Sequence, residues 1–525
     1  MSGLRKKILW VDDEIEFLRS HIMFLETRGY SVIPVFSGDD AIQMIHENPG
    51  EFDIVLLDEQ MPGKDGLTTL EEIKEFNPNL PVVMVTKSEE EKLMEDALGR
   101  KIDGYLTKPV NPSQILLACK KILDSKRIIS SQTAQKFVRH YSDVRVSLAS
   151  RLSANEWIKL YEKISQWDLE LEHHDDEGLR QTHAGQKSDS NAAFASFLTE
   201  NYAGWIKGEY QPPVLSFNIV DKLLAPLLNE GKKVYFVVLS GMRLDQYLGI
   251  EGTLRNIFNV KRTYYYSILP TASPFTRSSL FSGKLPAEIL SLYKNIWTTG
   301  EEEEIDSSTE ARLLHDKLNS INIELPEDLS WFINMSRLVN HSDILKQIHK
   351  CRKSKLVTLV MNFFDTVTQA DPVRGIFHEM VNDESVIRIL SQSWFQRSGL
   401  LQILKEISKQ DCTIVFTSDH GHTFCSRGTE LYGIDKLNGN IRYAFGKEIS
   451  SDERRAVFLE DPSHFGLPRL NDESNCVIAK ENYYFIHPEK FEFYNKQYKN
   501  TFQHGGISLE EVIMPIAICK PIKGA

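Results

Sequence analysis

The stretch IVLLDEQMPGKDG, residues 54–66, joins a short apolar run to an acidic residue and a Pro-Gly turn. Ile54–Leu57 predicts a buried strand, because a short apolar run bounded by turn residues is typical of a strand in a parallel sheet. Asp58 follows that strand directly. In an open parallel α/β sheet, functional groups gather at the carboxyl ends of the strands. The stretch therefore marks Asp58 as a candidate functional residue at a sheet edge.

The same pattern recurs on both sides of this stretch, over residues 1–124. Apolar runs alternate with segments of helical periodicity, which predicts a doubly wound parallel sheet. The predicted strands are Lys7–Val11, Ser31–Phe36, Ile54–Leu57, Val82–Thr86 and Gly104–Leu106. The predicted helices are Ile15–Arg28, Ser37–Asn48, Asp65–Phe76, Glu89–Leu98 and Pro112–Asp124.

Acidic residues at two strand ends indicate a magnesium site. Asp12 and Asp13 follow the first predicted strand, and Asp58 follows the third. Phosphoryl transfer to a carboxylate adds negative charge beside existing acids, and a hard divalent cation with oxygen ligands offsets it. Asp13, Asp58 and the carbonyl of Gln60 are the predicted ligands of Mg²⁺, and Asp12 is the predicted partner of a metal-bound water.

Three residues at the ends of later strands complete this edge. Lys108 is a point charge suited to phosphoryl oxygens. Thr86 carries a hydroxyl that could move toward a phosphoryl group on Asp58, and Tyr105 is an aromatic residue that could swing inward. Five correctly ordered groups at strand ends favour a phosphorylation switch over ordinary solvated surface charges.

This front segment resembles the receiver domain of bacterial two-component systems. The matching positions are Asp12, Asp13, Asp58, Met61–Gly63, Asp65–Gly66, Thr86, Tyr105 and Lys108–Pro109. The resemblance implies a CheY-like fold, phosphorylation of Asp58 by a sensor histidine kinase, bound Mg²⁺ and a cis bond before Pro109. Lys87 departs from the family, which often has a small residue there, so we expect altered water access to the phosphoryl group.

Residues 125–212 have helical periodicity and predict a small helical bundle that links two larger parts. The polar stretch Gln181–Asn191 predicts a loop, and Gln211–Pro213 predicts a hinge. No helix-turn-helix with a basic recognition helix is present in the sequence. We therefore do not expect this segment to bind duplex DNA.

Residues 213–525 again predict a large α/β sheet with functional groups at one edge. The predicted strands are Lys233–Leu239, Ser267–Leu269, Leu356–Phe364, Thr413–Thr417 and Val512–Ile518. The candidate functional residues lie just after predicted strands or just before the last one: Thr271, Asp365, Asp419–His420 and His504. The segment from Lys284 to Arg352 has helical character and predicts an inserted cap.

These residues resemble the PglZ branch of the alkaline-phosphatase superfamily, which binds two zinc ions around a threonine or serine nucleophile. The resemblance implies that Thr271 is the nucleophile. It implies Asp419 and His420 as ligands of one ion, and Asp365 and His504 as ligands of the other. Ser240 and Gln369 depart from the family, because an aspartate and a histidine ligand are expected there. Each zinc site thus lacks one usual ligand, and zinc binding and structural roles for these residues both stay open.

Composition excludes several classes of protein. The 525 residues are 41% hydrophobic and 26% charged, which indicates several globular domains. The net charge of −12 does not steer the chain toward nucleic acid. Six scattered cysteines suit a reducing compartment. No apolar run approaches the roughly 20 residues that span a bilayer, so we expect no membrane segment.

The order of receiver, helical linker and PglZ domain resembles that of PorX-type response regulators, over essentially the whole chain. The resemblance implies a cytoplasmic location, phosphorylation-driven dimerisation, a link to type IX secretion and phosphodiesterase activity on oligonucleotide signals. Two hypotheses follow. In one, phosphorylated Asp58 controls a metal-dependent phosphodiesterase. In the other, the back half has lost the chemistry and is a phosphorylation-gated module that binds a ligand such as an oligonucleotide, or a protein such as a sigma factor.

Overall fold

The computed structural model divides the chain into two compact units, Met1–Arg139 and His140–Ala525. The residues that the structure describes are 5–87, 102–172, 174, 176–293, 306–326, 328–335, 341–368, 383–433, 440–469 and 474–522. None of the helices in these ranges has an apolar stretch long enough to cross a bilayer.

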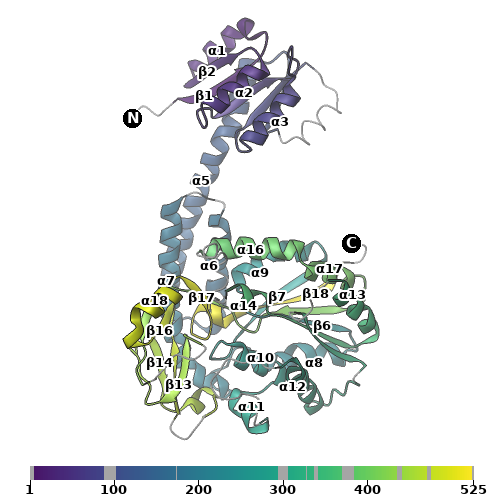
Figure 1. The fold of residues 1–525 in the computed structure, drawn as a ribbon, viewed down its shortest axis with the longest axis vertical. Helices are drawn as coiled ribbons and strands as arrows, with labels where there is room; N and C mark the ends of the chain where they lie inside the picture. The colour runs from purple at the N-terminus through teal and green to yellow at the C-terminus, as the bar shows by residue number, and fades with distance from the viewer. Residues whose placement is uncertain are drawn as a thin grey trace. The chain divides into compact units, whose positions relative to one another are not determined.

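The first unit, which contains the labelled elements β1, β2 and α1–α3 in Figure 1, has a parallel sheet. Its strand order is β2-β1-β3-β4-β5. Its strands are β1 (Lys6–Val11), β2 (Tyr30–Val35), β3 (Ile54–Asp58), β4 (Val82–Thr86) and β5 (Gly104–Thr107). Its helices are α1 (Arg19–Glu26), α2 (Gly38–Glu47), α3 (Gly66–Phe76) and the start of α5 (Pro112–Leu148). The doubly wound sheet predicted for residues 1–124 is confirmed. The predicted helix Glu89–Leu98 lies outside the described residues.

Two helical predictions differ from the structure. The last predicted helix of the front segment was expected to end at Asp124, but α5 continues to Leu148. The loop predicted at Gln181–Asn191 is wrong, because these residues lie inside α7 (Glu177–Ile206). The stretch is polar because its buried side chains have polar partners: Gln186 donates to the Tyr141 carbonyl, and Lys187 and Asn191 contact Glu384 and Glu510 of the back half.

The linker helices α6 (Ala154–Glu172) and α7 share one hydrophobic core with the back half. The ring of Phe194 on α7 lies 5.3 Å from that of Trp157 on α6 and 6.2 Å from that of Tyr266. Tyr266 ends a strand of the main sheet, β7. The linker helices and the back half therefore pack as one unit.

The main sheet of the second unit has the order β7-β18-β10-β6-β9-β8. Strands β10, β6, β9 and β8 are parallel, and β18 is antiparallel to both of its neighbours. Its strands are β6 (Val234–Leu239), β7 (Phe258–Tyr266), β8 (Ser330–Asn334), β9 (Leu356–Met361), β10 (Thr413–Thr417) and β18 (Ile513–Pro521). The predicted strand Ser267–Leu269 is wrong: β7 ends at Tyr266, and a cis Leu269–Pro270 bond follows.

The segment expected to be a cap is partly a component of the main sheet, because it supplies the edge strand β8. A separate lobe instead lies between β10 and β18 in the sequence, and Figure 1 shows its strands beside the main sheet. The strands of this lobe are β11 (Thr423–Cys425), β12 (Arg427–Glu430), β13 (Tyr443–Lys447), β14 (Ala456–Leu459), β15 (Ser474–Ala479), β16 (Tyr483–Ile486) and β17 (Thr501–Gln503).

Helices cover both faces of the main sheet, with separate hydrophobic clusters on its two sides. The α-helices of this part are α8 (Ala225–Asn229), α9 (Leu244–Arg255), α10 (Ser273–Ser282), α11 (Pro286–Leu292), α12 (Ser307–Ser320), α13 (His341–Lys350), α14 (Phe363–Thr368), α16 (Glu384–Arg397), α17 (Gly399–Ile407), α18 (Phe491–Tyr498) and α19 (Leu509–Val512).

Candidate functional site

The first unit gathers three acids at the carboxyl ends of β1 and β3. One oxygen each from Asp12, Asp13 and Asp58 lies within 4.8 Å of the others. Asp12 and Asp58 are buried, whereas Asp13 is exposed. Lys108 Nζ donates to Asp12 Oδ2 and Asp58 Oδ2, both at 2.8 Å. Three oxygens at this spacing can hold a hard divalent cation such as Mg²⁺.

The protonation of this group depends on the balance between burial and Lys108. Burial raises the pKa of Asp58, Lys108 opposes this rise, and the charges of Asp12 and Asp13 add to it. Burial disfavours the charge of Lys108, but its hydrogen bonds to Asp12 and Asp58 outweigh burial and raise its pKa. Lys108 thus remains a cation that holds the two buried carboxylates together.

The remaining switch residues lie on neighbouring strands. Thr86 ends β4, and its hydroxyl donates to Glu59, a residue that the sequence did not single out. Tyr105 is half-buried on β5. Lys87 Nζ lies 3.6 Å from Glu14, and both side chains are exposed. The peptide bond before Pro109 is cis, as the resemblance implies.

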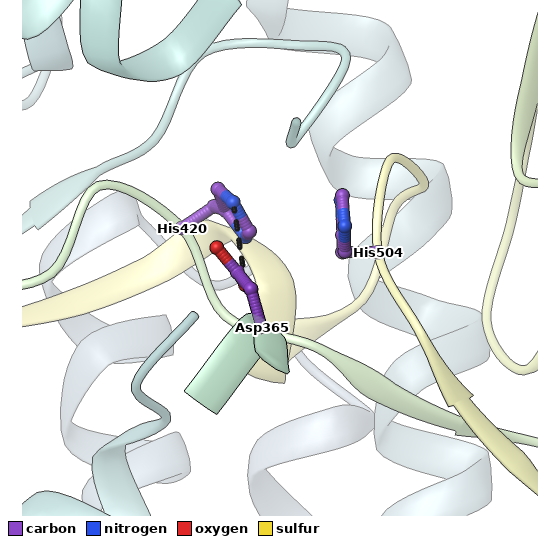
Figure 2. Close-up of side chains that lie close together, drawn as sticks. All are labelled: Asp365, His420 and His504. Carbon is purple, nitrogen blue, oxygen red and sulfur yellow. Dashed lines mark ion pairs between the residues drawn. The ribbon is translucent and has the colours of Figure 1, made fainter. Parts of the chain in front are cut away.

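In the second unit, Asp365, His420 and His504 converge from three different segments. Asp365 lies in the first turn of α14, His420 follows β10, and His504 follows β17. One ligand atom of each lies within 4.8 Å of the others, and Figure 2 shows the three side chains close together, with the His420–Asp365 pair marked by a dashed line. The sequence had paired His420 with Asp419 and Asp365 with His504. The structure brings His420 to Asp365 and His504, and it also keeps His420 Nε2 3.8 Å from Asp419 Oδ2.

The two histidines are suited to binding a metal ion. His420 Nδ1 donates to the carbonyl of Gly421 at 2.9 Å, which leaves Nε2 facing Asp365 Oδ1 at 4.0 Å. A backbone carbonyl commonly orients a metal-binding histidine in this way. His504 Nδ1 is buried without a hydrogen-bond partner. Two histidines and a carboxylate are a donor set found at catalytic zinc sites, so these residues fit zinc.

Asp419 lies beside this cluster and has a neutral partner. Ser240 Oγ donates to Asp419 Oδ2 at 3.1 Å. Burial alone would raise the pKa of Asp419, but the charges of His420 and Arg277 and the Ser240 hydrogen bond lower it. Asp419 is therefore an ionised carboxylate at neutral pH. Gln369, the other departure from the family, lies outside the described residues.

Thr271 and Ser273 take different positions. Thr271 is fully buried: its hydroxyl donates to the Gly506 carbonyl at 2.8 Å and accepts from the Gly505 N–H at 3.1 Å. Ser273 is partly exposed at the start of α10, and its Oγ lies 3.0 Å from His420 Nε2.

Sequence reasoning missed Ser273. The Ser-Pro pair that opens α10 is a helix-start signal that could have drawn attention to it. A serine hydroxyl beside a carboxylate–histidine cluster can act as a nucleophile toward an ester.

Three family models match successive parts of the chain. The response regulator receiver domain matches residues 8–120, and the PorX response regulator linker domain matches residues 127–206. The BREX system PglZ alkaline phosphatase-like domain matches residues 219–518. The last of these covers more than half of the chain.

Curated relatives and solved structures match the front of the chain. The transcriptional regulatory protein ResD of Bacillus subtilis is 35% identical over 117 residues, which cover 22% of this chain and 48% of that protein. The transcriptional regulatory protein BaeR of Escherichia coli O6:H1 is 35% identical over 119 residues, which also cover 22% of this chain and 48% of that protein. The chain thus spans about half the length of these relatives.

Two solved structures similar to this chain contain receiver proteins. One is a receiver domain protein from Methanospirillum hungatei JF-1. The two sequences are 32% identical, the match covers 23% of this chain and 95% of that chain, and the TM-score is 0.22. The other is the CheX-CheY-BeF3-Mg complex from Borrelia burgdorferi. The two sequences are 27% identical, the match covers 23% of this chain and 91% of that chain, and the TM-score is 0.22.

Proposed function

Because the chain belongs to the PglZ alkaline phosphatase-like family, in the arrangement of PorX-type response regulators, we propose that phosphorylation of Asp58 controls a metal-dependent phosphodiesterase in the second unit. Its receiver domain places the chain in two-component regulation, with a sensor histidine kinase as its partner. Receiver domains generally bind Mg²⁺, and alkaline-phosphatase-like domains bind metal ions. The convergence of Asp365, His420 and His504 carries the proposal of enzymatic activity.

In the receiver, Asp12, Asp13 and Asp58 would hold Mg²⁺, and Lys108 would pair with the phosphoryl oxygens on Asp58. Lys108 already contacts the Asp58 carboxylate, which supports this role. Thr86 and Tyr105 would change position in response to phosphorylation of Asp58, and the chain would then dimerise. The Asp58→Ala variant should not dimerise when acetyl phosphate and Mg²⁺ are added, as measured by light scattering. Dimerisation that persists in the variant would refute the switch.

In the second unit, Asp365, His420 and His504 would hold one zinc ion. A bound zinc ion would lower the pKa of a nearby hydroxyl and offset charge on the phosphoryl oxygens. We assign the attack on phosphorus to Ser273 rather than Thr271, because Ser273 borders the cluster and is partly exposed. The Ser273 hydroxyl would lose its proton and its Oγ would bond to phosphorus, while the bond from phosphorus to the leaving oxygen breaks and that oxygen takes up a proton. Water would then hydrolyse the ester between serine and phosphate, which releases a phosphomonoester and restores the Ser273 hydroxyl.

The nature of the substrate and the cellular role are parts of the same proposal. An oligonucleotide phosphodiester as substrate, a cytoplasmic location and a link to type IX secretion are supported by the PorX-type arrangement of the three family matches. We propose no binding to duplex DNA, because the chain carries a net charge of −12.

Metal content and turnover test the enzymatic proposal together. The purified chain should contain about one zinc ion, since three protein ligands make one catalytic site. Ser273→Ala should abolish cleavage of an aryl phosphodiester and keep the zinc ion. The control, Thr271→Ser, retains a hydroxyl for the Gly505 and Gly506 contacts and should retain turnover. If the parent chain contains no zinc and does not cleave the aryl phosphodiester, the enzymatic proposal is refuted.

A second candidate function rests on Ser240. Its hydroxyl occupies the position beside Asp419 where the family is expected to have a metal-binding aspartate. Under this alternative the second unit has lost the chemistry and binds an oligonucleotide or a protein such as a sigma factor when Asp58 is phosphorylated. Phosphorylation-dependent binding of an oligonucleotide without cleavage, in a zinc-free protein, would favour this alternative.

A further inference from the structure

Two buried side chains of the linker helix α7 contact α19, the short helix that follows His504. Asn191 Nδ2 donates to both carboxylate oxygens of Glu510, at 3.0 and 3.3 Å, and Asn191 Oδ1 accepts from the N–H of Leu509 at 2.7 Å. Lys187, one turn earlier on α7, has its Nζ 3.2 Å from Glu510. An N–H in the first turn of a helix has no partner within that helix. Asn191 therefore satisfies a buried backbone N–H of α19 that has no partner within the helix, and an acidic side chain beside it.

The same short helix holds the turn that carries His420. The N–H of Gly421 donates to the carbonyl of Glu511 at 3.2 Å. A Cβ at Gly421 would lie 1.9 Å from the carbonyl oxygen of Glu510, so the two backbones are in direct contact. The His420 ring is in turn oriented by the Gly421 carbonyl. A shift of α19 would therefore shift His420.

The turn that carries His504 depends on α19 as well. Glu511 Oε1 accepts from the N–H of Gly506 at 2.8 Å, and Glu511 Oε2 accepts from Ser508 Oγ at 2.8 Å. The buried guanidinium of Arg442 pairs with the same carboxylate. Two of the three clustered side chains thus stand on turns that α19 fixes.

We propose that Asn191 is a positioning residue for the metal centre: it fixes α19, and α19 fixes the turns that present His420 and His504. The inference rests on the proposed function, because it takes both histidines as metal ligands. Asn191 belongs to the helical linker and lies 319 residues before Glu510 in the chain. The linker would thus take a direct part in building the site of the second unit.

The isosteric variant Asn191→Asp tests this role in the full chain. It keeps the acceptor for Leu509 but places a carboxylate against that of Glu510, at the 3.0 Å now spanned by a hydrogen bond. We expect zinc affinity, measured by titration against a chromophoric chelator, to fall about 10–100-fold, the range typical of residues that orient metal ligands. Asn201→Asp is the matched control, since its amide donates only to Phe197 within α7.

A swap separates positioning from general damage. Asn191→Asp combined with Glu510→Gln reverses donor and acceptor and preserves the net charge, so zinc affinity should recover to within about threefold of the parent. Failure of the swap to restore affinity, or equal losses for Asn191→Asp and Asn201→Asp, would overturn the proposal. If Asn191→Asp does not fold, the zinc affinities of Asn191→Ala and Asn201→Ala are compared in the same assay, and equal losses overturn the proposal.

Hydrogen exchange on the metal-free protein gives a readout that does not need zinc. Peptides that contain residues 419–422 and 504–508 should exchange faster in Asn191→Asp than in the parent or in Asn201→Asp, and the swap should slow them again. If the parent binds no zinc yet these peptides respond, the enzymatic proposal fails and the positioning role stands. If the peptides do not respond, the positioning role fails whatever the metal content.

Discussion

Replacement of Gly241 by alanine tests the position of Asp365 in the metal cluster. Gly241 lies between β6 and α9 with a φ of +79°, a conformation that costs a residue with a side chain about 1–2 kcal/mol. An added Cβ would lie 2.2 Å from Asp365 Oδ1 and 3.1 Å from its Cγ. No side chain accommodates such an approach without moving. The substitution should therefore displace the carboxylate that completes the cluster.

The expected result has two separate parts. Stability of the second unit should fall by about 1–2 kcal/mol through backbone strain alone, as measured by chemical denaturation. Zinc affinity should fall by at least about 10-fold, because displacement of a ligand weakens binding no less than loss of a residue that orients one. The second effect depends on the contact with Asp365, whereas the first does not.

Gly231→Ala provides a control with the same backbone strain and no clash. Gly231 has a φ of +72°, and an added Cβ would meet no atom within 4 Å. Both variants should lose similar stability, and only Gly241→Ala should lose zinc affinity. If zinc affinity is unchanged in Gly241→Ala, or falls equally in both, Asp365 is not a ligand and the cluster is not the metal site.

Three further predictions concern buried charges. Lys108→Ala should destabilise the receiver by about 3–5 kcal/mol. Loss of Lys108 should also raise the pKa of Asp58 further in the folded protein. The stability of the variant should therefore fall more steeply than that of the parent as the pH rises above about 4, as measured by thermal unfolding at a series of pH values. Arg442→Met should destabilise the second unit by about 3–5 kcal/mol, because Glu511 loses its buried partner, and a denaturant midpoint equal to that of the parent would contradict this. Ser240→Asp should lower the melting temperature without zinc and raise it with zinc, in paired calorimetry; equal shifts in both conditions would exclude an added metal ligand.

The receiver was predictable because its signals are local. Strands β3 and β4 are short apolar runs, fully buried along their length, and turn residues bound them. Asp58 follows such a run directly, so its place at the sheet edge follows from sheet geometry alone. Elements of this kind need no knowledge of distant partners.

The first half of helix α7 was not predictable in the same way, because its polar residues find their partners far along the chain. Lys187 pairs with Glu384, 197 residues later, and Asn191 with Glu510, 319 residues later. Without these partners, a run of polar residues resembles a loop. Up to Asn191 the buried face of α7 is polar, so hydrophobic periodicity could not reveal this half of the helix.

The choice between two hydroxyls also required the fold. Thr271 and Ser273 are two residues apart, and both follow a strand end where a nucleophile is expected. The structure directs the Thr271 hydroxyl into the backbone of Gly505 and Gly506, and leaves that of Ser273 beside His420. Side chains two residues apart in an irregular segment have no fixed relation, so the sequence could not assign these directions.

Ser240 explains why a single ion is the better expectation for the second unit. A buried carboxylate must be paired or hydrogen-bonded, and an aspartate at position 240 would add a second carboxylate beside Asp419 that only another cation could offset. The Ser240 hydroxyl donates to Asp419 instead, and the charges of His420 and Arg277 also favour the ionised Asp419. The need for a second ion is thereby removed. Asp365, His420 and His504 still form a group that could hold one metal ion, and three is the number of protein ligands that catalytic zinc sites use.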